Sequence, residues 1–252
     1  ATTNTGTLTF TTTANATTLV NGNIGASGKL LNAVTIVSAT AVEATLGGDI
    51  YATTINATGA SDDGVVNFNG SLNGTTLAIG SAGGIFNIAA NKNINAAITT
   101  TDGKATLNFA GGNTTTGLVG VIGTLAAVKV INIDGGIVTF EKSIASDTIT
   151  IDTLTTFKTT AAVSINSDTA INNSGTMDIG GTMTLVAAST AATDMAAHAS
   201  TSKMTLVKNS AYTSGVVIVN ADSDMTVNST NVIDVTPHAT FISGDLTLLD
   251  SH

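Results

Sequence analysis

Apolar and polar residues alternate in short stretches along the chain, and these stretches return at a regular interval. An Asn between two large apolar residues (Val, Leu, Ile or Phe) occurs four times, and the third residues of these triplets are Phe68, Ile88, Phe109 and Ile133. These residues are 20, 21 and 24 positions apart. Since alternate side chains of a strand point to opposite faces, each occurrence predicts a strand with two apolar side chains on one face and an Asn on the other.

A second signature recurs between these strands and combines turn-forming residues with an apolar one. NGNI, GGDI, NGSL and NKNI end at Ile24, Ile50, Leu72 and Ile94, at intervals of 26, 22 and 22 residues. Gly and Asn tolerate the backbone conformations that a corner requires. We expect Gly47, Gly48 and Asp49 to turn the chain. Ile50 is then expected to enter the core and Tyr51 to face outward.

Two landmarks that advance together by about 20 to 24 residues are typical of a solenoid, in which each repeat is one coil. Hairpins of a β-sandwich would not keep step in this way, and the chain has too few leucines for a leucine-rich repeat. The predicted fold class is therefore all-β, a right-handed parallel β-helix with roughly 20–24 residues per coil. About 11 coils at a spacing of about 4.8 Å would give a rod about 50 Å long.

The second half of the sequence keeps the rhythm less well. Strands are predicted within 136–144, 147–151, 161–165 and 175–185, and again at 204–207, 215–219, 224–227 and 244–249. Between these two groups the alternation is lost, which predicts a short insertion or helix near 187–203. We interpret 1–252 as a single β-helix segment, less regular from about residue 187 and cut from a longer rod.

Composition narrows the classes of partner. All eight basic residues are lysines, and with 17 acidic residues the formal net charge is −9. Nucleic acids and anionic membranes are bound by clustered positive charge, so both are poor candidates. The chain has no cysteine, which fits export through an oxidising compartment. It also has neither an apolar run of about 20 residues nor a recognisable signal peptide, so it is either cytosolic or an excised mature segment.

Three stretches of the first half resemble a known family: TGTLTFTTTANATTLVNGNIG (5–25), GGDIYATTIN (47–56) and GVVNFNGSLNG (64–74). They are similar to the passenger region of the rickettsial surface cell antigens, large autotransporters of the outer membrane protein B type. The resemblance covers about the first 145 residues, and the rest by composition. It implies a passenger on the extracellular face of the bacterial outer membrane that adheres to host cells, aids their invasion and coats the surface. It also implies a host cell-surface protein as partner and a separate C-terminal β-barrel, absent from this sequence, as anchor.

Parallel β-helices also carry polysaccharide lyases and hydrolases, which need carboxylates on one exposed face. The best local candidate for a calcium or acid-base site is the pair Asp62 and Asp63, although the flanking Gly59 and Gly64 favour a solvated loop. Single acidic residues beside Gly, Thr or Ser are expected in turns or outward positions: Asp102, Asp134, Asp147, Asp152 and Asp178.

Other chemical motifs are weak. His198, His238 and His252 have no Cys or HExxH arrangement near them, which disfavours transition-metal and Ser-His-Asp chemistry. The glycines of GLVGVIG, at Gly117, Gly120 and Gly123, have a spacing like that of a dinucleotide loop but lack a βαβ unit.

Thr-x-Thr pairs suggest ice binding as a further function, but the pairs do not recur in every coil, as a flat rank of threonines would require. Examples are Thr7 with Thr9, Thr148 with Thr150 and Thr182 with Thr184. Threonine-rich outward strand faces explain them more simply.

The leading hypothesis is a non-enzymatic adhesin passenger with no cofactor, no metal and no assigned binding residues. The alternatives are a β-helix lyase or hydrolase and a purely structural surface-layer protein. Two or more carboxylates with a Lys on one face of three successive coils would favour the enzyme, and a bland face of Thr, Asn and Ser would favour the adhesin.

Overall fold

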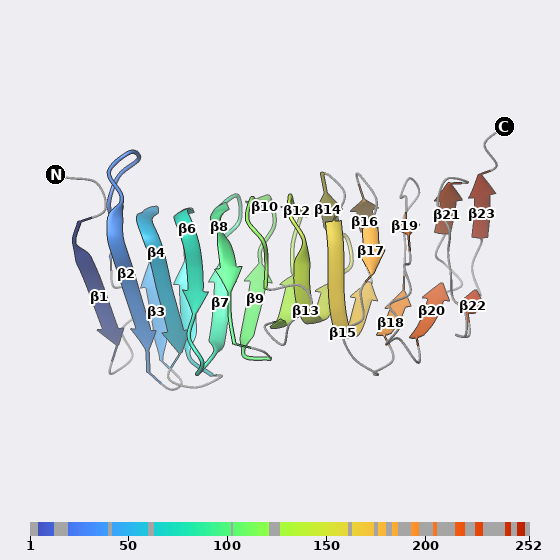
Figure 1. The fold of residues 1–252 in the computed structure, drawn as a ribbon, viewed down its shortest axis with the longest axis horizontal. Coiled ribbons are helices and arrows are strands. Elements are labelled where there is room, and N and C mark those ends of the chain that lie inside the picture. Colours follow the sequence, from blue (N-terminus) through green and yellow to red (C-terminus); the bar gives the residue numbers. More distant parts are fainter. Residues whose placement is uncertain are drawn as a thin grey trace.

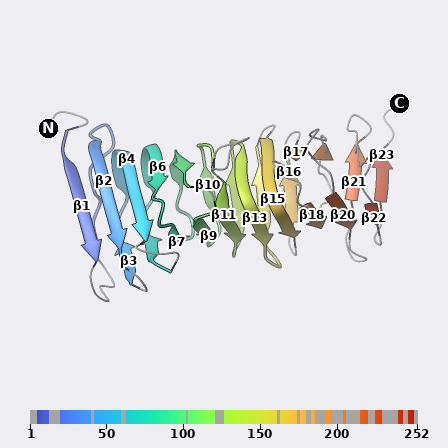
Figure 2. The same ribbon diagram turned by 60° about the horizontal axis from the view of Figure 1, so that its bottom comes forward.

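The computed structural model describes residues 5–12, 20–39, 42–59, 63–101, 103–120 and 127–160 with their side chains. Beyond these it describes the backbone of the strands from β15 to β23. Every regular element in the described residues is a β-strand, and strands stack side by side along the long axis of the molecule (Figures 1 and 2). The predicted all-β class is confirmed.

The strands form two long sheets in which every pairing is parallel (Figure 1). The nine-stranded sheet runs in the order β1 (Thr7–Thr12), β2 (Leu31–Ser38), β4 (Ile50–Gly59), β6 (Leu72–Ile79), β8 (Ile94–Thr99), β10 (Asn113–Thr115), β12 (Ile137–Phe140), β14 (Thr156–Thr159) and β16 (Thr176–Ile179). From β2 to β17, consecutive strands of the chain alternate between the two sheets, and each pairs with strands of the neighbouring coils.

The main path of the second sheet runs from β3 (Glu43–Leu46) through β5 (Val65–Phe68), β7 (Gly84–Ile88), β9 (Ala105–Phe109), β11 (Val128–Ile133), β13 (Ile144–Ile151), β15 (Val163–Asn173), β18 (Thr193–Ala196) and β20 (Gly215–Val219) to β22 (Thr240–Ile242). β17 (Met183–Leu185) and β19 (Met204–Thr205) branch from it, and β21 (Met225–Asn228) pairs with β23 (Leu246–Leu249). The fold is a parallel β-solenoid of about six turns, with further strands continuing the pairing.

Both sequence landmarks are confirmed as register positions. Phe68, Ile88, Phe109 and Ile133 are successive pairing partners in the second sheet. Ile24, Ile50, Leu72 and Ile94 form a second such series. Consecutive partners are 18 to 26 residues apart, from Ile131 with Ile149 to Leu8 with Val34, so coil length varies more than the predicted 20 to 24.

Each turn presents three inward-facing walls, which we number in chain order. The first wall consists of Ile24, Ile50, Leu72, Ile94, Thr115 and Phe140, the second of Val34, Ile55, Leu77, Ile98, Val119 and Ile144, and the third of Leu46, Phe68, Ile88, Phe109, Ile133 and Ile151. All of these side chains are buried and, apart from Thr115, they belong to one continuous apolar core. Burying this apolar surface is the dominant favourable term in folding.

The four-letter corner signature is explained by hydrogen bonds between successive coils. Its third residue accepts a hydrogen bond from the backbone N–H of the equivalent residue in the next coil. The Asp49 N–H donates to Asn23 Oδ1 at 2.9 Å and the Ser71 N–H to Asp49 Oδ1 at 2.8 Å. The Asn93 N–H donates to Ser71 Oγ at 3.1 Å. As predicted, Ile50 is fully buried, and Tyr51 on the opposite face is half-buried.

The irregular segment predicted near 187–203 is described only in part. Thr193–Ala196 form β18, which pairs with β15 and β20, so these four residues are extended and not helical. The other positions of that segment lie outside the described residues. The predicted strands at 204–207, 215–219, 224–227 and 244–249 overlap β19, β20, β21 and β23.

Candidate binding surface

The outer face of the second wall is a broad surface without charge. It is built by the outward residues of β1, β2, β4, β6 and β8, which alternate with the buried residues. The outward residues that lie over the second wall, beyond the corner with the first wall, are Thr7, Thr9, Thr11, Ala33, Thr35, Val37, Thr54, Asn56, Thr58, Thr76, Ala78, Ala97 and Thr99. We call this set the neutral face. In a chain of net charge −9, a sheet face of five strands with only small neutral side chains is a distinct chemical environment.

The residues of the neutral face lie in register across the coils. One row is Thr7, Ala33, Thr54, Thr76 and Ala97, and the next is Thr9, Thr35, Asn56, Ala78 and Thr99. Parallel pairing spaces these side chains by about 4.8 Å between coils and about 6.6 Å along each strand. The surface is therefore a mesh of hydroxyls, methyls and one carboxamide, and alanines interrupt both rows.

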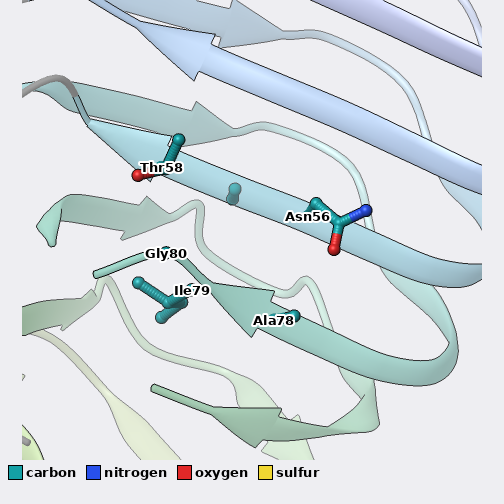
Figure 3. A pocket seen from close by; sticks show the side chains of 6 residues that line it. Asn56, Thr58, Ala78, Ile79 and Gly80 are labelled. Carbon is teal, nitrogen blue, oxygen red and sulfur yellow. The ribbon is translucent and has the colours of Figure 1, made fainter. Parts of the chain in front are cut away.

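A small hollow lies on the neutral face between β4 and β6 (Figure 3). It has a volume of about 140 Å³ and is lined by residues 56–58 and 78–80. Asn56 and Thr58 come from β4, whereas their register neighbours on the β6 side, Ala78 and Gly80, are much smaller. The step from large to small side chains in adjacent coils creates the hollow.

The polar groups beside the hollow are only partly engaged. Asn56 Nδ2 donates a long hydrogen bond of 3.4 Å to Thr35 Oγ1, and Thr58 Oγ1 donates to the carbonyl oxygen of Gly59 at 3.0 Å. No hydrogen bond from a described residue reaches Asn56 Oδ1. The side-chain amide of Asn56 thus has a free acceptor and a second N–H for a ligand.

The outer face of the third wall carries a ladder of asparagines. Asn132 Nδ2 donates to Asn108 Oδ1 at 2.9 Å, Asn108 to Asn87 at 2.8 Å, and Asn87 to Asn67 at 2.7 Å. Asn67 ends the ladder by donating to Thr45 Oγ1 at 3.1 Å. Because the amides satisfy one another, this ladder holds neighbouring coils together and offers fewer free polar groups than Asn56 does.

Two carboxylates stack at one corner. Asp134 follows β11 and Asp152 follows β13 in the next coil, and both side chains are exposed. Partial burial and then the negative charge of Asp152 raise the pKa of Asp134 above its ordinary 3.8. The pair occupies two coils and not the three that the enzyme hypothesis requires.

Among the other acidic candidates, the described side chains of Asp63 and Asp147 form no metal-binding cluster with this pair. Asp63 is an exposed turn residue, whereas Asp62 and Asp102 lie outside the described residues. Asp147 lies half-buried in β13 at a register irregularity. Asp178 pairs in register with Lys158, and only its backbone is described. Where side chains are described, no group of three or more His, Cys, Asp or Glu is placed to hold a metal ion.

The remaining candidates are turn or strand positions, or are not described. Gly117 packs against the backbone of Ala96, and Gly120 donates its N–H to the Ile98 carbonyl oxygen at 2.9 Å, so both belong to the coil wall. Gly123, Thr182 and the three histidines lie outside the described residues, and of Thr184 only the backbone is described.

The Thr-x-Thr pairs fall on different surfaces. Thr7 and Thr9 belong to the neutral face, whereas Thr148 and Thr150 lie outside the third wall. The sequence did not single out Asn56, Ala78 or Gly80. The sequence feature that marks the hollow is a small residue 22 positions after a larger outward one, such as Ala78 after Asn56. This spacing indicates a hollow only when the register between the two coils is known.

No helix among the described residues has the length and apolarity to cross a membrane. Comparison of the chain with protein-family models, with curated proteins and with solved structures found no match. The structure thus defines a parallel β-solenoid with a neutral face.

Proposed function

We propose that this chain is a passenger segment of a bacterial autotransporter, displayed on the extracellular face of the outer membrane, where it adheres to host cells and contributes to their invasion. The single observation that carries the proposal is the neutral face: a regular solenoid that presents a broad, uncharged surface of Thr, Ala and Asn. The resemblance to rickettsial surface cell antigens supplies the class of protein.

The proposed mechanism is a stiff spacer with repeated surfaces. Stacked coils hold many weakly interacting groups at fixed spacing, so a partner that contacts several coils gains affinity without any strong single contact. The partner is a host cell-surface molecule, and anchoring is left to a separate domain. This proposal needs no catalytic residue, cofactor or metal.

Adhesion of coated beads tests the proposal. Beads carrying the purified chain should bind cultured host cells several times better than albumin-coated beads, and soluble chain should compete. Equal binding by both kinds of bead would sink the adhesin assignment for this segment. That outcome would favour a structural coat, which needs stable display but no receptor.

The neutral face has no charged side chain, which also supports an adhesin over a polysaccharide lyase or hydrolase. Such an enzyme needs paired carboxylates aimed at a substrate in a groove. Among the described side chains, the one stacked acidic pair sits on an exposed corner, away from the hollow. Release of reducing ends from acidic and neutral polysaccharides by the purified chain would overturn the non-enzymatic proposal.

A further inference from the structure

From the geometry of the hollow we infer that the neutral face binds an uncharged glycan, and that the hollow accepts the acetamido group of an N-acetylated hexosamine. The inference deepens the proposed function by naming the partner chemistry, and its biological meaning rests on that function. The glycan would be carried by a molecule of the host surface. Four features support the inference. The neutral face carries no charge, its side chains form a polar mesh, it contains the hollow, and the side-chain amide of Asn56 has unused hydrogen-bonding groups.

Charge decides the class of glycan. No Lys occurs among the outward residues of β1, β2, β4, β6 and β8, so a sulfated or sialylated chain would find no cation to compensate its desolvation. No Asp or Glu occurs there either, so a cationic polymer gains nothing. A neutral partner with many hydroxyl groups can exchange its hydrogen bonds to water for bonds to Thr and Asn side chains.

Two other neutral occupants fit less well. An ordered water lattice requires unbroken ranks of one side chain, but both rows of the neutral face are interrupted by alanines, namely Ala33, Ala78 and Ala97. A second copy of this chain would need large apolar or aromatic anchors at the centre of its interface. The largest aliphatic side chain of the neutral face is that of Val37.

The hollow itself selects the acetamido group. Its volume of about 140 Å³ equals about four to five times a water's share of liquid volume, and suits a group of about four non-hydrogen atoms. Ala78 and the backbone at Gly80 offer an apolar surface for a methyl group (Figure 3). The free Oδ1 and second Nδ2–H of Asn56 then match the N–H and C=O of a sugar-linked amide.

Gly80 borders the hollow but is a poor position for a blocking substitution. A Cβ at this position would lie 2.6 Å from Thr58 Oγ1 and 2.8 Å from Thr58 Cβ, so the side chain of Thr58 already fills the space above it. Ala78 is the better position for a blocking substitution. It faces outward beside Asn56 in register, and Val at this position adds two methyl groups to the hollow and none to the core.

Titration of the full chain with a soluble N-acetylglucosamine oligomer, followed by amide NMR shifts, tests the inference. The expected result is saturable shifts at residues 56–58 and 78–80 at millimolar oligomer. The deacetylated oligomer, a glucose oligomer and heparin should each produce at least tenfold weaker binding. Absence of saturable shifts with the acetylated oligomer, or equal binding of any comparator, would overturn the inference.

Matched variants locate the site. Ala78→Val should weaken binding at least tenfold, whereas Ala110→Val, at an exposed alanine that follows β9 outside the neutral face, should leave it unchanged. Asn56→Ala removes the amide without filling the hollow and should also weaken binding. It serves as the second variant if Ala78→Val disturbs the sheet. Unchanged affinity in Asn56→Ala or Ala78→Val would exclude the hollow as the site.

The bead assay separates this inference from the proposed function. Bead adhesion that persists in Asn56→Ala, together with no oligomer binding by the original chain, would sink the glycan inference alone. Oligomer binding by a chain whose beads do not adhere to cells would sink the adhesin proposal alone.

Discussion

The turns built from β4 to β9 and those built from β12 to β15 place their bent strand at different corners. β4 passes without a break from the first wall at Ile50 to the second wall at Ile55. β13 instead continues from the second wall at Ile144 to the third wall at Ile151. The remaining corners are short connections, such as residues 80–83 in the earlier turns and 141–143 in the later ones.

The two bent strands share one local feature. In β4 the alternation of buried and outward residues is interrupted at Thr53 and Thr54, which are both outward, and in β13 it is interrupted at Asp147 and Thr148. Two successive outward residues shift the phase of the alternation. The side chains that follow therefore pack in the next wall, while the strand continues its backbone pairing with the neighbouring coils. A corner that requires more residues becomes a connection between two strands.

The cores of the two regions also differ. In the earlier turns the first wall consists of Ile24, Ile50, Leu72 and Ile94 and is wholly apolar. In the later turns it buries the side chains of Asn113, Thr115, Phe140, Phe157 and Thr159. The rings of Phe109 and Phe140 meet edge to face at 5.6 Å between centroids, and those of Phe140 and Phe157 stack at 5.0 Å. The first wall of the later turns therefore combines aromatic rings with buried polar groups, whereas the first wall of the earlier turns is aliphatic.

The largest expected effect comes from Phe140→Ala. It removes a fully buried ring that contacts two others, and it should lower the free energy of unfolding by about 3–5 kcal/mol. Phe68→Ala, in the earlier region, should cost less, because aromatic pairs add about 0.5–1.5 kcal/mol beyond burial. Urea unfolding followed by circular dichroism measures both. An equal loss in the two variants would remove the ring contacts as a difference between the regions.

Asn113→Ala should be the next most damaging substitution. Asn113 Nδ2 donates to the carbonyl oxygens of Ala89 and Lys92, each at 2.7 Å, and Oδ1 accepts from the Gly111 N–H at 2.8 Å. Its loss leaves one buried and two partly buried hydrogen bonds unmade, and because water can reach the partly buried groups the total cost should be about 1–3 kcal/mol. Hydrogen exchange should increase locally at residues 110–115. Unchanged exchange at this corner would contradict the role of Asn113.

Gly70→Ala tests the close approach of coils in the earlier region. The added Cβ would lie 2.1 Å from the Gly48 carbonyl carbon and oxygen, so the backbone must move, at a cost of about 1–3 kcal/mol. Gly22 occupies the equivalent position of an earlier corner and has no atom within 4 Å of an added Cβ, so Gly22→Ala is the matched control. Thermal unfolding should separate the variants, and equal midpoints would refute the steric argument.

A reciprocal exchange tests the polar first wall of the later region. Thr115 is fully buried, its Oγ1 has no hydrogen-bond partner, and its register neighbour in the earlier region is Ile94. Thr115→Val should stabilise the fold by about 1–2 kcal/mol, because it removes an unsatisfied hydroxyl without changing shape. Ile94→Thr should destabilise it by a similar amount or more. Destabilisation by Thr115→Val would reveal a partner for the hydroxyl.

The smallest effect is expected from Asp134→Asn, and it depends on pH. Because the folded-state pKa of Asp134 is raised, the ionised carboxylate is disfavoured in the fold, and this penalty is fully present above the raised pKa. Asp134→Asn should therefore stabilise the chain at neutral pH by less than about 1 kcal/mol, as for other exposed charge pairs. The advantage should vanish as the pH falls through the raised pKa towards 3.8. A pH-independent difference would contradict the assigned cause.

The sequence by itself determined the period, the strand positions and the inward residues of the first turns. Strand alternation has a period of two and each corner signature ends in a core residue, so the buried positions of Ile50, Leu72 and Ile94 follow from the sequence alone. Side-chain pattern alone sufficed because the buried face of a strand must be apolar. The same logic weakened after residue 110, where polar residues such as Asn113 and Thr115 enter the core.

Only the tertiary structure decided which residues of neighbouring coils meet. Asp134 and Asp152 are 18 positions apart and Asn56 and Ala78 are 22 apart, and whether such pairs stack depends on the length of each corner. Partners along the series from Phe68 to Ile133 are 20, 21 and 24 residues apart, and since the corners absorb these differences in length, register cannot be read from composition. The hollow beside Asn56 is therefore a product of stacking, whereas the strands that form it are a product of the sequence pattern.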